Sequence, residues 1–213
     1  MALTAEEKKK RKENKLVEQL LTINEEDIRN FRGNPLLKRA GEATELSAKH
    51  IKEYKKCMKD PVYFAERYIK IVHVDKGLIP ITLYDYQKRI LKALKENRFN
   101  IILSCRQSGK TTIIVCFLLW FVIFHADKRC AILANKGATA RQIVGRIELA
   151  YMNLPKWLQQ GVSDWNKGSF GLENGSSIMS AATSSDSVRG ESYSCVKGNT
   201  KVTILDDNEN IYY

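Results

Sequence analysis

The residues best suited to chemistry in this 213-residue chain lie between Ser104 and Thr111. Gly109 lets backbone N–H groups close around phosphate oxygens, because glycine has no side chain to obstruct them. Lys110 can reach the terminal phosphates of a nucleotide, and Thr111 can offer its hydroxyl to Mg²⁺. Ser104 stands where this loop pattern normally begins with glycine. The spacing indicates phosphate binding, and the alternative is an ordinary turn that opens a helix with Thr111 near its N-cap.

A phosphate-binding loop needs a strand before it and a helix after it. The apolar residues 101–103 predict the strand, and residues 112–115 begin the helix. Residues 113–124 are continuously apolar, yet this run is shorter than the roughly 20 residues that span a membrane. The sequence therefore predicts a helix buried on all sides beside a sheet, and no membrane partner.

The chain beyond this helix alternates between strand and helix patterns. Residues 130–134 read as a short buried strand, residues 139–152 as a helix and residues 176–182 as a further strand, after a hairpin between Gly161 and Gly175. This order is typical of an α/β fold with a parallel sheet. Its ligand is expected at the carboxyl ends of the strands.

The chain before the loop is expected to be mainly helical. A connector at residues 34–48 leads to a helical pattern at residues 48–71, and Asp60-Pro61 interrupts that pattern as a cap and first helical residue. Residues 72–83 look extended, with a turn at residues 75–77, and a helix follows from Tyr84 to about Glu96.

Tyr86 and Gln87 stand at the start of this last helix. A glutamine amide can pair with an adenine edge and a tyrosine ring can stack on the base. A Tyr-Gln pair at a helix start is, by itself, more often a matter of surface and packing.

The composition excludes a disordered or fibrous protein, since 44% of the residues are hydrophobic. The net charge of +11 favours a polyanionic partner. A basic helical segment at residues 6–21 could contact DNA or remain a solvated arm. The absence of an apolar secretory segment predicts a cytoplasmic protein. Free thiols in a reducing compartment, with no zinc site, are expected from the odd number and scattered positions of Cys57, Cys105, Cys116, Cys130 and Cys195.

The loop at residues 105–112 resembles that of the large terminase subunits of tailed, T4-like bacteriophages, the motors that package DNA into capsids. The resemblance extends, in the family's order and at similar spacing, from about residue 34 to about residue 194. It is carried further by residues 62–68 (VYFAERY), 84–87 (YDYQ), 132–137 (ILANKG), 165–169 (WNKGS), 174–177 (NGSS) and 184–190 (SSDSVRG).

This resemblance implies a P-loop ATPase domain of the additional-strand kind related to helicases, with a parallel sheet flanked by helices, and incomplete in this chain. It implies ATP and Mg²⁺ as cofactors. Its expected partners are double-stranded DNA, the phage portal and the small terminase, in the host cytoplasm. The resemblance divides the chain into three parts: a helical N-terminal region at residues 1–60, a partial ATPase domain at residues 61–194 and a short β-type tail at residues 195–213.

The resemblance also gives roles to individual residues. Thr111 is the expected Mg²⁺ contact, and Tyr86 with Gln87 matches the adenine-recognition element. Arg106 matches an arginine that acts on the γ-phosphate; a guanidinium there can stabilise the transferring group, or bind phosphate only in the ground state. Arg189 lies in a matching Val-Arg-Gly loop. The full nucleotide-binding set is Tyr86, Gln87, Ser104, Gln107, Ser108, Gly109, Lys110, Thr111 and Thr112.

The family's next element, a strand ending in an acidic pair, is missing after residue 194. The segment from Cys195 onward instead resembles the first block of an intein, whose cysteine thiol attacks the preceding carbonyl. The later intein residues are missing too. A split intein completed by a complementary C-terminal intein-terminase polypeptide and an incomplete gene fragment both fit this pattern.

Two other functions remain open. In the first, residues 202–205 with Asp206-Asp207 are the genuine acidic strand of a helicase-like module that acts alone or is truncated. In the second, the chain is a basic DNA-binding protein whose loop is incidental. DNA binding without ATP binding is the result that would favour the second.

Overall fold

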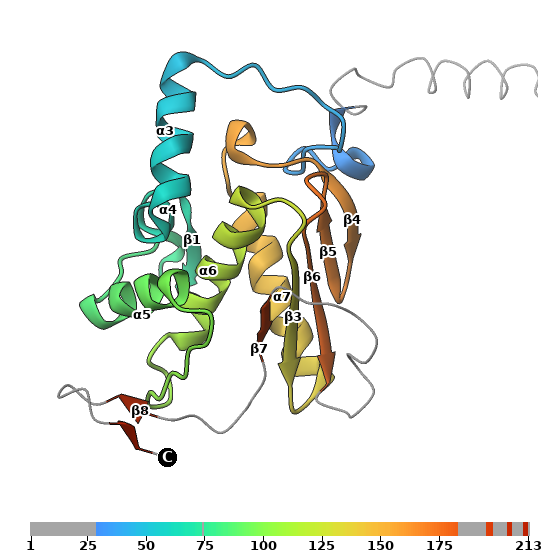
Figure 1. Ribbon diagram of the computed structural model, residues 1–213. Helices are drawn as coiled ribbons and strands as arrows, with labels where there is room; N and C mark the ends of the chain where they lie inside the picture. Colours follow the sequence, from blue (N-terminus) through green and yellow to red (C-terminus); the bar gives the residue numbers. More distant parts are fainter. Residues whose placement is uncertain (1–28, 74, 183–194, 198–203, 206–210, 213) are drawn as a thin grey trace, which may run out of the picture.

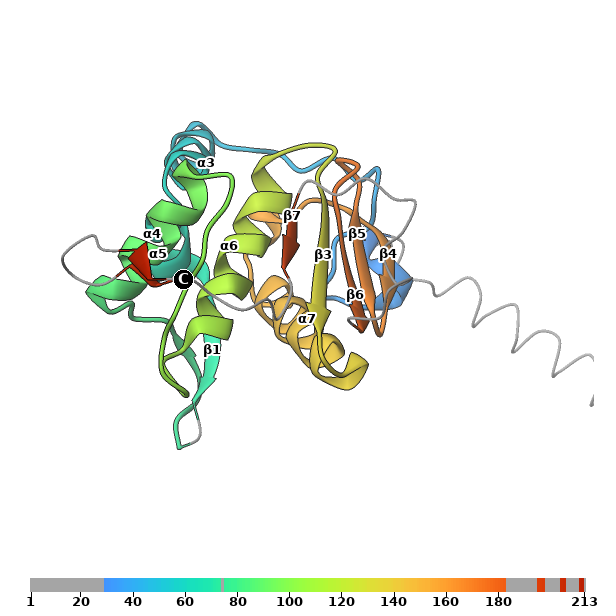
Figure 2. The same ribbon diagram turned by 60° about the horizontal axis from the view of Figure 1, so that its bottom comes forward.

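A central apolar helix separates a group of helices from a five-stranded sheet. The computed structural model describes residues 29–73, 75–182, 195–197, 204–205 and 211–212. Helix α6 (Lys110–Phe124) lies between the two groups in two different views (Figures 1 and 2). Every residue of α6 from Ile113 onward is buried except Phe121. The expectation of a helix buried on all sides is thus confirmed.

The main sheet contains both parallel and antiparallel pairs. Its strands are β3 (Arg129–Ala134), β4 (Val162–Asn166), β5 (Ser169–Leu172), β6 (Ser177–Ala182) and β7 (Cys195–Lys197), in the order β4-β5-β6-β3-β7. β3 runs parallel to both β6 and β7, whereas β4, β5 and β6 form an antiparallel meander. The predicted hairpin and the parallel pair around β3 are confirmed, but the sheet as a whole is mixed.

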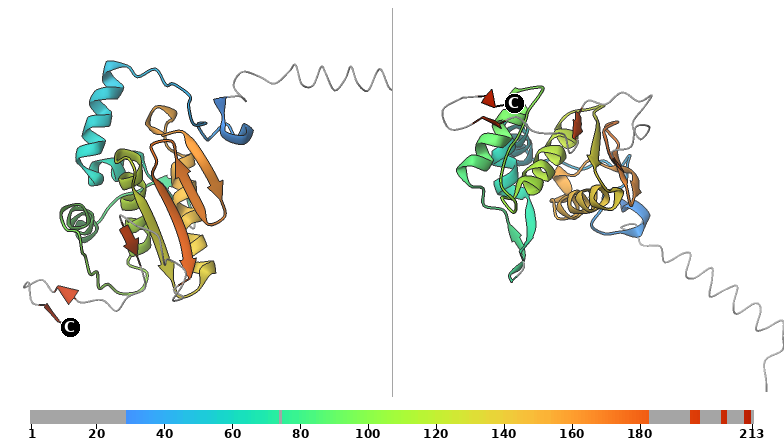
Figure 3. Two further views of the ribbon diagram at one scale, coloured as in Figure 1. Left: turned by 45° about the vertical axis from the view of Figure 1, so that its right-hand side comes forward. Right: turned by 90° about the horizontal axis from the view of Figure 1, so that it is seen from below.

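Helix α7 (Gly137–Met152) packs on one face of this sheet. Its buried side chains, among them Val144, Ile147 and Tyr151, recur at helical spacing and join the core. The left view of Figure 3 looks onto the opposite face, which carries no helix of the part of the chain that the structure describes.

The strand predicted at residues 101–103 is not formed. These residues have no strand neighbour among the described residues, and their backbone forms no hydrogen bond there. Ile101 and Leu103 are about half exposed, at 51% and 53%. An apolar run becomes a strand only where a second strand can pair with it. The prediction was wrong: residues 101–103 have no strand assignment, and no strand of the described part of the chain lies beside them.

The helical group consists of three helices and a hairpin. It contains α3 (Ala48–Lys59), α4 (Pro61–Tyr68), α5 (Asp85–Glu96), β1 (Lys70–His73) and β2 (Gly77–Pro80). The Asp60 carboxylate accepts a hydrogen bond from the Val62 N–H at 2.8 Å, and Pro61 opens α4, as predicted. The helical pattern ends at Tyr68 rather than Ile71, since β1 pairs with β2 from Lys70 onward.

The segment before α3 covers the outer edge of the sheet. It starts with the short helix η1 (Phe31–Gly33), and Arg39 then forms a parallel bridge with Val162 of β4. The buried Gln159, which follows the short helix η2 (Lys156–Leu158), holds this segment in place by hydrogen bonds to its backbone. Its amide donates to the carbonyls of Leu36, Tyr151 and Leu154 at 3.0, 3.2 and 3.0 Å and accepts from the Lys38 N–H at 3.2 Å.

Two further short strands, β8 (Ile204–Leu205) and β9 (Ile211–Tyr212), pair antiparallel with each other. The predicted basic helix at residues 6–21, Arg189 and Asp206-Asp207 lie outside the described residues. No described helix has the length and hydropathy needed to cross a membrane.

Candidate phosphate-binding site

The loop before α6 has the backbone shape of an anion site. Gln107 and Gly109 have positive φ angles of 62° and 75°, so the backbone curls just before the helix. None of the N–H groups of residues 105–109 has an acceptor within the described part of the chain. The first N–H groups of any helix also lack helical partners. These unpaired donors beside the positive end of α6 are suited to hold phosphate oxygens.

The side chain of Lys110 turns back onto this loop. Its ammonium donates to the carbonyls of Ser104 and Cys105 at 3.4 and 2.9 Å. The Ser108 hydroxyl lies 3.0 Å from both the Ser104 hydroxyl and the Cys105 carbonyl. Ser104, at the position where the pattern usually has glycine, is therefore part of the loop's internal bonding, and Lys110 already points across the loop.

Tyr86 and Gln87 support the loop from α5. The Tyr86 hydroxyl donates to the Ser108 carbonyl at 2.6 Å, and the Gln87 amide donates to the same carbonyl at 3.3 Å. The amide also donates to the Tyr86 hydroxyl and accepts from the Tyr84 N–H. Gln87 is only 6% exposed, so its donors serve the chain itself. An adenine contact by Gln87 requires one of these bonds to be exchanged.

Two features make glycine necessary at position 109: its positive φ angle and the close approach of the Gln87 side chain. A Cβ atom at this position would lie 2.7 Å from the Gln87 side-chain nitrogen. Any larger residue therefore strains the backbone and displaces the amide that supports Ser108.

An aromatic pair beside the loop was not predicted from the sequence. The rings of Tyr84 and Tyr86 stack with centroids 5.9 Å apart and planes 7° apart. Tyr84 is 68% exposed and Tyr86 is 37% exposed. The spacing of two residues did not indicate the pair, because residues i and i+2 of a regular helix do not face each other. Tyr84 precedes α5 as an extended residue, which brings the rings together.

The other predicted site residues have fewer contacts with the loop. Arg106 is exposed and has no hydrogen bond or ion pair with the described residues. Thr111 and Thr112 lie in the first turn of α6. The backbone of Cys195 begins β7 and pairs with Cys130, near the amino end of β3, whereas the ligand is expected at the carboxyl ends of the strands. Among the described residues, no three His, Cys, Asp or Glu side chains gather to hold a metal ion.

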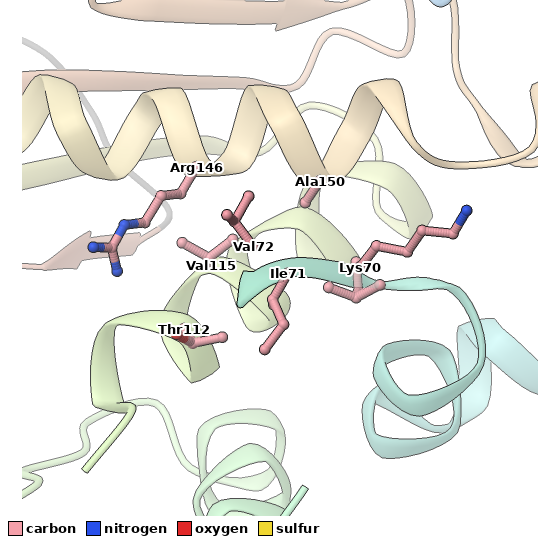
Figure 4. A pocket seen from close by; sticks show the side chains of 8 residues that line it. Lys70, Ile71, Val72, Thr112, Val115, Arg146 and Ala150 are labelled. Atoms are coloured by element: carbon pink, nitrogen blue, oxygen red, sulfur yellow. The ribbon is translucent and has the colours of Figure 1, made fainter. Parts of the chain in front are cut away.

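A cavity of about 240 Å³ lies beside the first turns of α6, between β1, α6 and α7 (Figure 4). Ile71, Val72, Val115 and Ala150 give it an apolar wall, and Arg146 and Lys70 extend from it in different directions. Of the predicted nucleotide-binding residues it includes Thr112 alone. The cavity is thus separate from the loop surface that carries the unpaired N–H groups.

Residues 101–199 match the family model described as terminase large subunit, T4likevirus-type, N-terminal. The match begins just before the phosphate-binding loop and continues through α6, the main sheet and β7. Over these residues the chain is thus similar to the N-terminal part of such large subunits. Tyr86 and Gln87 precede the matched residues, so the support of the terminase match does not extend to them.

Proposed function

We propose that this chain is the N-terminal part of a terminase motor that binds ATP with Mg²⁺ at residues 104–112. The observation that carries the proposal is the curled loop with unpaired N–H groups at the start of α6. The terminase match covers the same loop. In such a motor, hydrolysis of the bound nucleotide supplies the free energy that moves DNA.

Each group around the loop has a distinct part in this proposal. The N–H groups of residues 105–109 hold phosphate oxygens, and Lys110 exchanges its two carbonyl partners for the terminal phosphates. Thr111 offers its hydroxyl to Mg²⁺. Arg106 is exposed and unpaired within the described chain, so it is free to reach a γ-phosphate. Tyr84 and Tyr86 offer ring faces to the adenine.

The proposal includes a second polypeptide or a later segment that completes the sheet. Residues 101–103 lack a neighbouring strand, and β7 has a free edge among the described residues. A strand paired there could bring a Mg²⁺-binding carboxylate and a catalytic glutamate to the loop. Double-stranded DNA, the portal and the small terminase are the further partners that this proposal includes.

The first experiment compares ATP binding with ATP turnover. The purified chain is expected to bind a fluorescent ATP analogue with Mg²⁺ and to hydrolyse ATP no faster than a blank. Lys110→Ala should weaken binding at least ten-fold, whereas Lys167→Ala, a matched change on the distant hairpin, should not. Rapid hydrolysis that disappears in Lys110→Ala would mean that the acidic strand is already present.

The completing polypeptide is proposed to be joined by splicing at Cys195. The thiol attacks the carbonyl carbon of Ser194, a thioester C–S bond forms, the peptide C–N bond breaks and the freed amine takes the thiol's proton. Mass spectrometry with dithiothreitol tests this step together with the complementary polypeptide. Cleavage after Ser194 that is lost in Cys195→Ala supports splicing, and an uncleaved mixture contradicts it.

A second candidate is a helicase-like ATP-binding module that acts on DNA without splicing. It is favoured by the parallel pairing of β7 with β3 and by a family match that extends four residues beyond Cys195. On this view Cys195–Lys197 belongs to the ATPase sheet itself. The candidate predicts hydrolysis by the isolated chain that is lost in Asp206→Asn. It also predicts no downstream reading frame that begins with intein blocks and continues as a terminase.

A further inference from the structure

Helix α3 presents a row of lysines that the phosphate-binding loop does not use. Consecutive residues of an α-helix are separated by about 100° around its axis. On this geometry the five lysines of α3 fall within an arc of about 120°, and no acidic residue lies inside the arc. This lysine stripe consists of Lys49, Lys52, Lys55, Lys56 and Lys59, all exposed.

The opposite side of α3 is fixed against the rest of the protein. The ring of Tyr54 meets that of Phe124 edge to face at 4.9 Å, and His50 stacks on Trp157 at 4.8 Å. The Trp120 indole donates to the carbonyl of the buried Cys57 at 2.8 Å. These contacts determine which side of α3 is buried, so the lysine stripe faces outward in a fixed orientation.

The charge of the stripe is largely uncompensated. Lys56 has a long ion pair with Glu53 at 3.9 Å, and the other four lysines have no ion pair with the described residues. Glu53 is itself engaged, because the hydroxyls of Tyr63 and Tyr68 donate to it. Lys95 of α5 adds a cation at the end of the stripe, where its ammonium donates to the Lys59 carbonyl.

We propose that the lysine stripe binds the phosphate backbone of double-stranded DNA. From Lys49 to Lys59 it extends about 15 Å at 1.5 Å per residue. One strand of duplex DNA presents a phosphate about every 3.4 Å along the axis, so the stripe spans roughly four phosphates. Lysines supply point charges and read no base edges. Binding is therefore independent of sequence and falls steeply with salt.

This surface is remote from the nucleotide loop. Trp120 and Phe124, which contact α3, lie in the last turns of α6, whereas Lys110 begins that helix. In Figure 1, α3 lies beyond the C-terminal end of α6. DNA binding by the stripe accordingly does not require ATP, and it stands independently of the proposed ATP site.

The experiment compares two triple variants of the full chain that lose the same charge. The test variant is Lys52→Gln, Lys55→Gln and Lys59→Gln, which leaves the ion-paired Lys56 in place. The control is Lys76→Gln, Lys128→Gln and Lys167→Gln. Glutamine is used because its helix propensity is close to that of lysine. Anisotropy of a labelled 30-base-pair duplex is measured from low to moderate NaCl, with circular dichroism to compare folding.

The test variant is expected to bind the duplex about ten- to hundred-fold more weakly at low salt and to lose about two to three units of salt slope. The control should keep the wild-type slope. Residues 1–28 are present in every variant, so the difference belongs to α3. Equal affinities of both variants would overturn the proposal. Binding to poly-glutamate is measured in the same way. If the test variant keeps its DNA affinity but no longer binds poly-glutamate, the partner is an acidic protein and the proposal is overturned. Lys110→Ala should bind DNA normally, which separates this result from the ATP site.

Discussion

At the scale of single residues, the phosphate loop is held by side chains from outside it. The Ser108 carbonyl receives hydrogen bonds from Tyr86 and Gln87, and Gly109 leaves room for the Gln87 amide. A sequence pattern that ends at the loop does not contain these supports. Their effect on phosphate binding can be measured separately from any effect on adenine.

Tyr86→Phe removes the 2.6 Å hydrogen bond to Ser108 and keeps the ring. A neutral hydrogen bond contributes about 1 kcal/mol, so binding of tripolyphosphate should weaken about five-fold. Isothermal titration with tripolyphosphate and Mg²⁺ measures this effect without a base. Tyr84→Phe, which removes a hydroxyl from the stacked neighbour, is the matched control. Weaker ATP binding with unchanged tripolyphosphate binding would show that Tyr86 acts on the adenine alone.

The cysteines provide a chemical test of the same loop. Cys105 is exposed within the loop, whereas burial raises the pKa of the Cys57 and Cys116 thiols to about 12. The thiolate is the reactive form, so at pH 8 these two buried thiols are almost entirely protonated. Iodoacetamide should therefore label Cys105 and spare Cys57 and Cys116, as read by peptide mass spectrometry. ATP with Mg²⁺ should slow the labelling of Cys105 at least several-fold. Labelling of Cys57 or Cys116 before Cys105 would contradict the placement of these residues.

At the scale of elements, Gln159 joins three parts of the chain. Gln159→Leu keeps the side-chain volume but leaves three carbonyls without this donor and the Lys38 N–H without its acceptor. The free energy of unfolding should fall by about 3 kcal/mol. Urea unfolding measures it, with Gln142→Leu on the exposed side of α7 as control. The control should stay within about 0.5 kcal/mol of wild type. Equal losses in both variants would mean that the amide network contributes little.

The difference between local signals and contacts distant in the chain explains which elements could be predicted from the sequence. The apolar run of α6 and the Asp60-Pro61 boundary are local signals, and both were predicted. The contact of Tyr86 with Ser108 joins residues 22 apart, and the bridge of Arg39 to Val162 joins residues far more distant. Such contacts leave no periodic pattern. The failed strand at residues 101–103 shows the same limit, because a strand depends on a neighbour as well as on its own residues.

At the scale of the whole molecule, residues 101–103 are an apolar segment with no paired strand among the described residues. Their amides form no hydrogen bond with the described chain, and Ile101 and Leu103 are half exposed. Deuterium should therefore exchange rapidly at these amides in the isolated chain, within seconds, while the amides of β3 exchange far more slowly.

Addition of the complementary terminase polypeptide is expected to slow exchange at residues 101–103 at least ten-fold, because a neighbouring strand would then accept hydrogen bonds from these amides. Exchange at the β1–β2 hairpin, Lys70–His73 and Gly77–Pro80, serves as the internal reference and should not change. Protection that extends to the phosphate loop only when ATP is also present would indicate that the completed sheet and the nucleotide stabilise each other. Slow exchange at residues 101–103 in the isolated chain would instead show that the sheet is already complete without a second polypeptide.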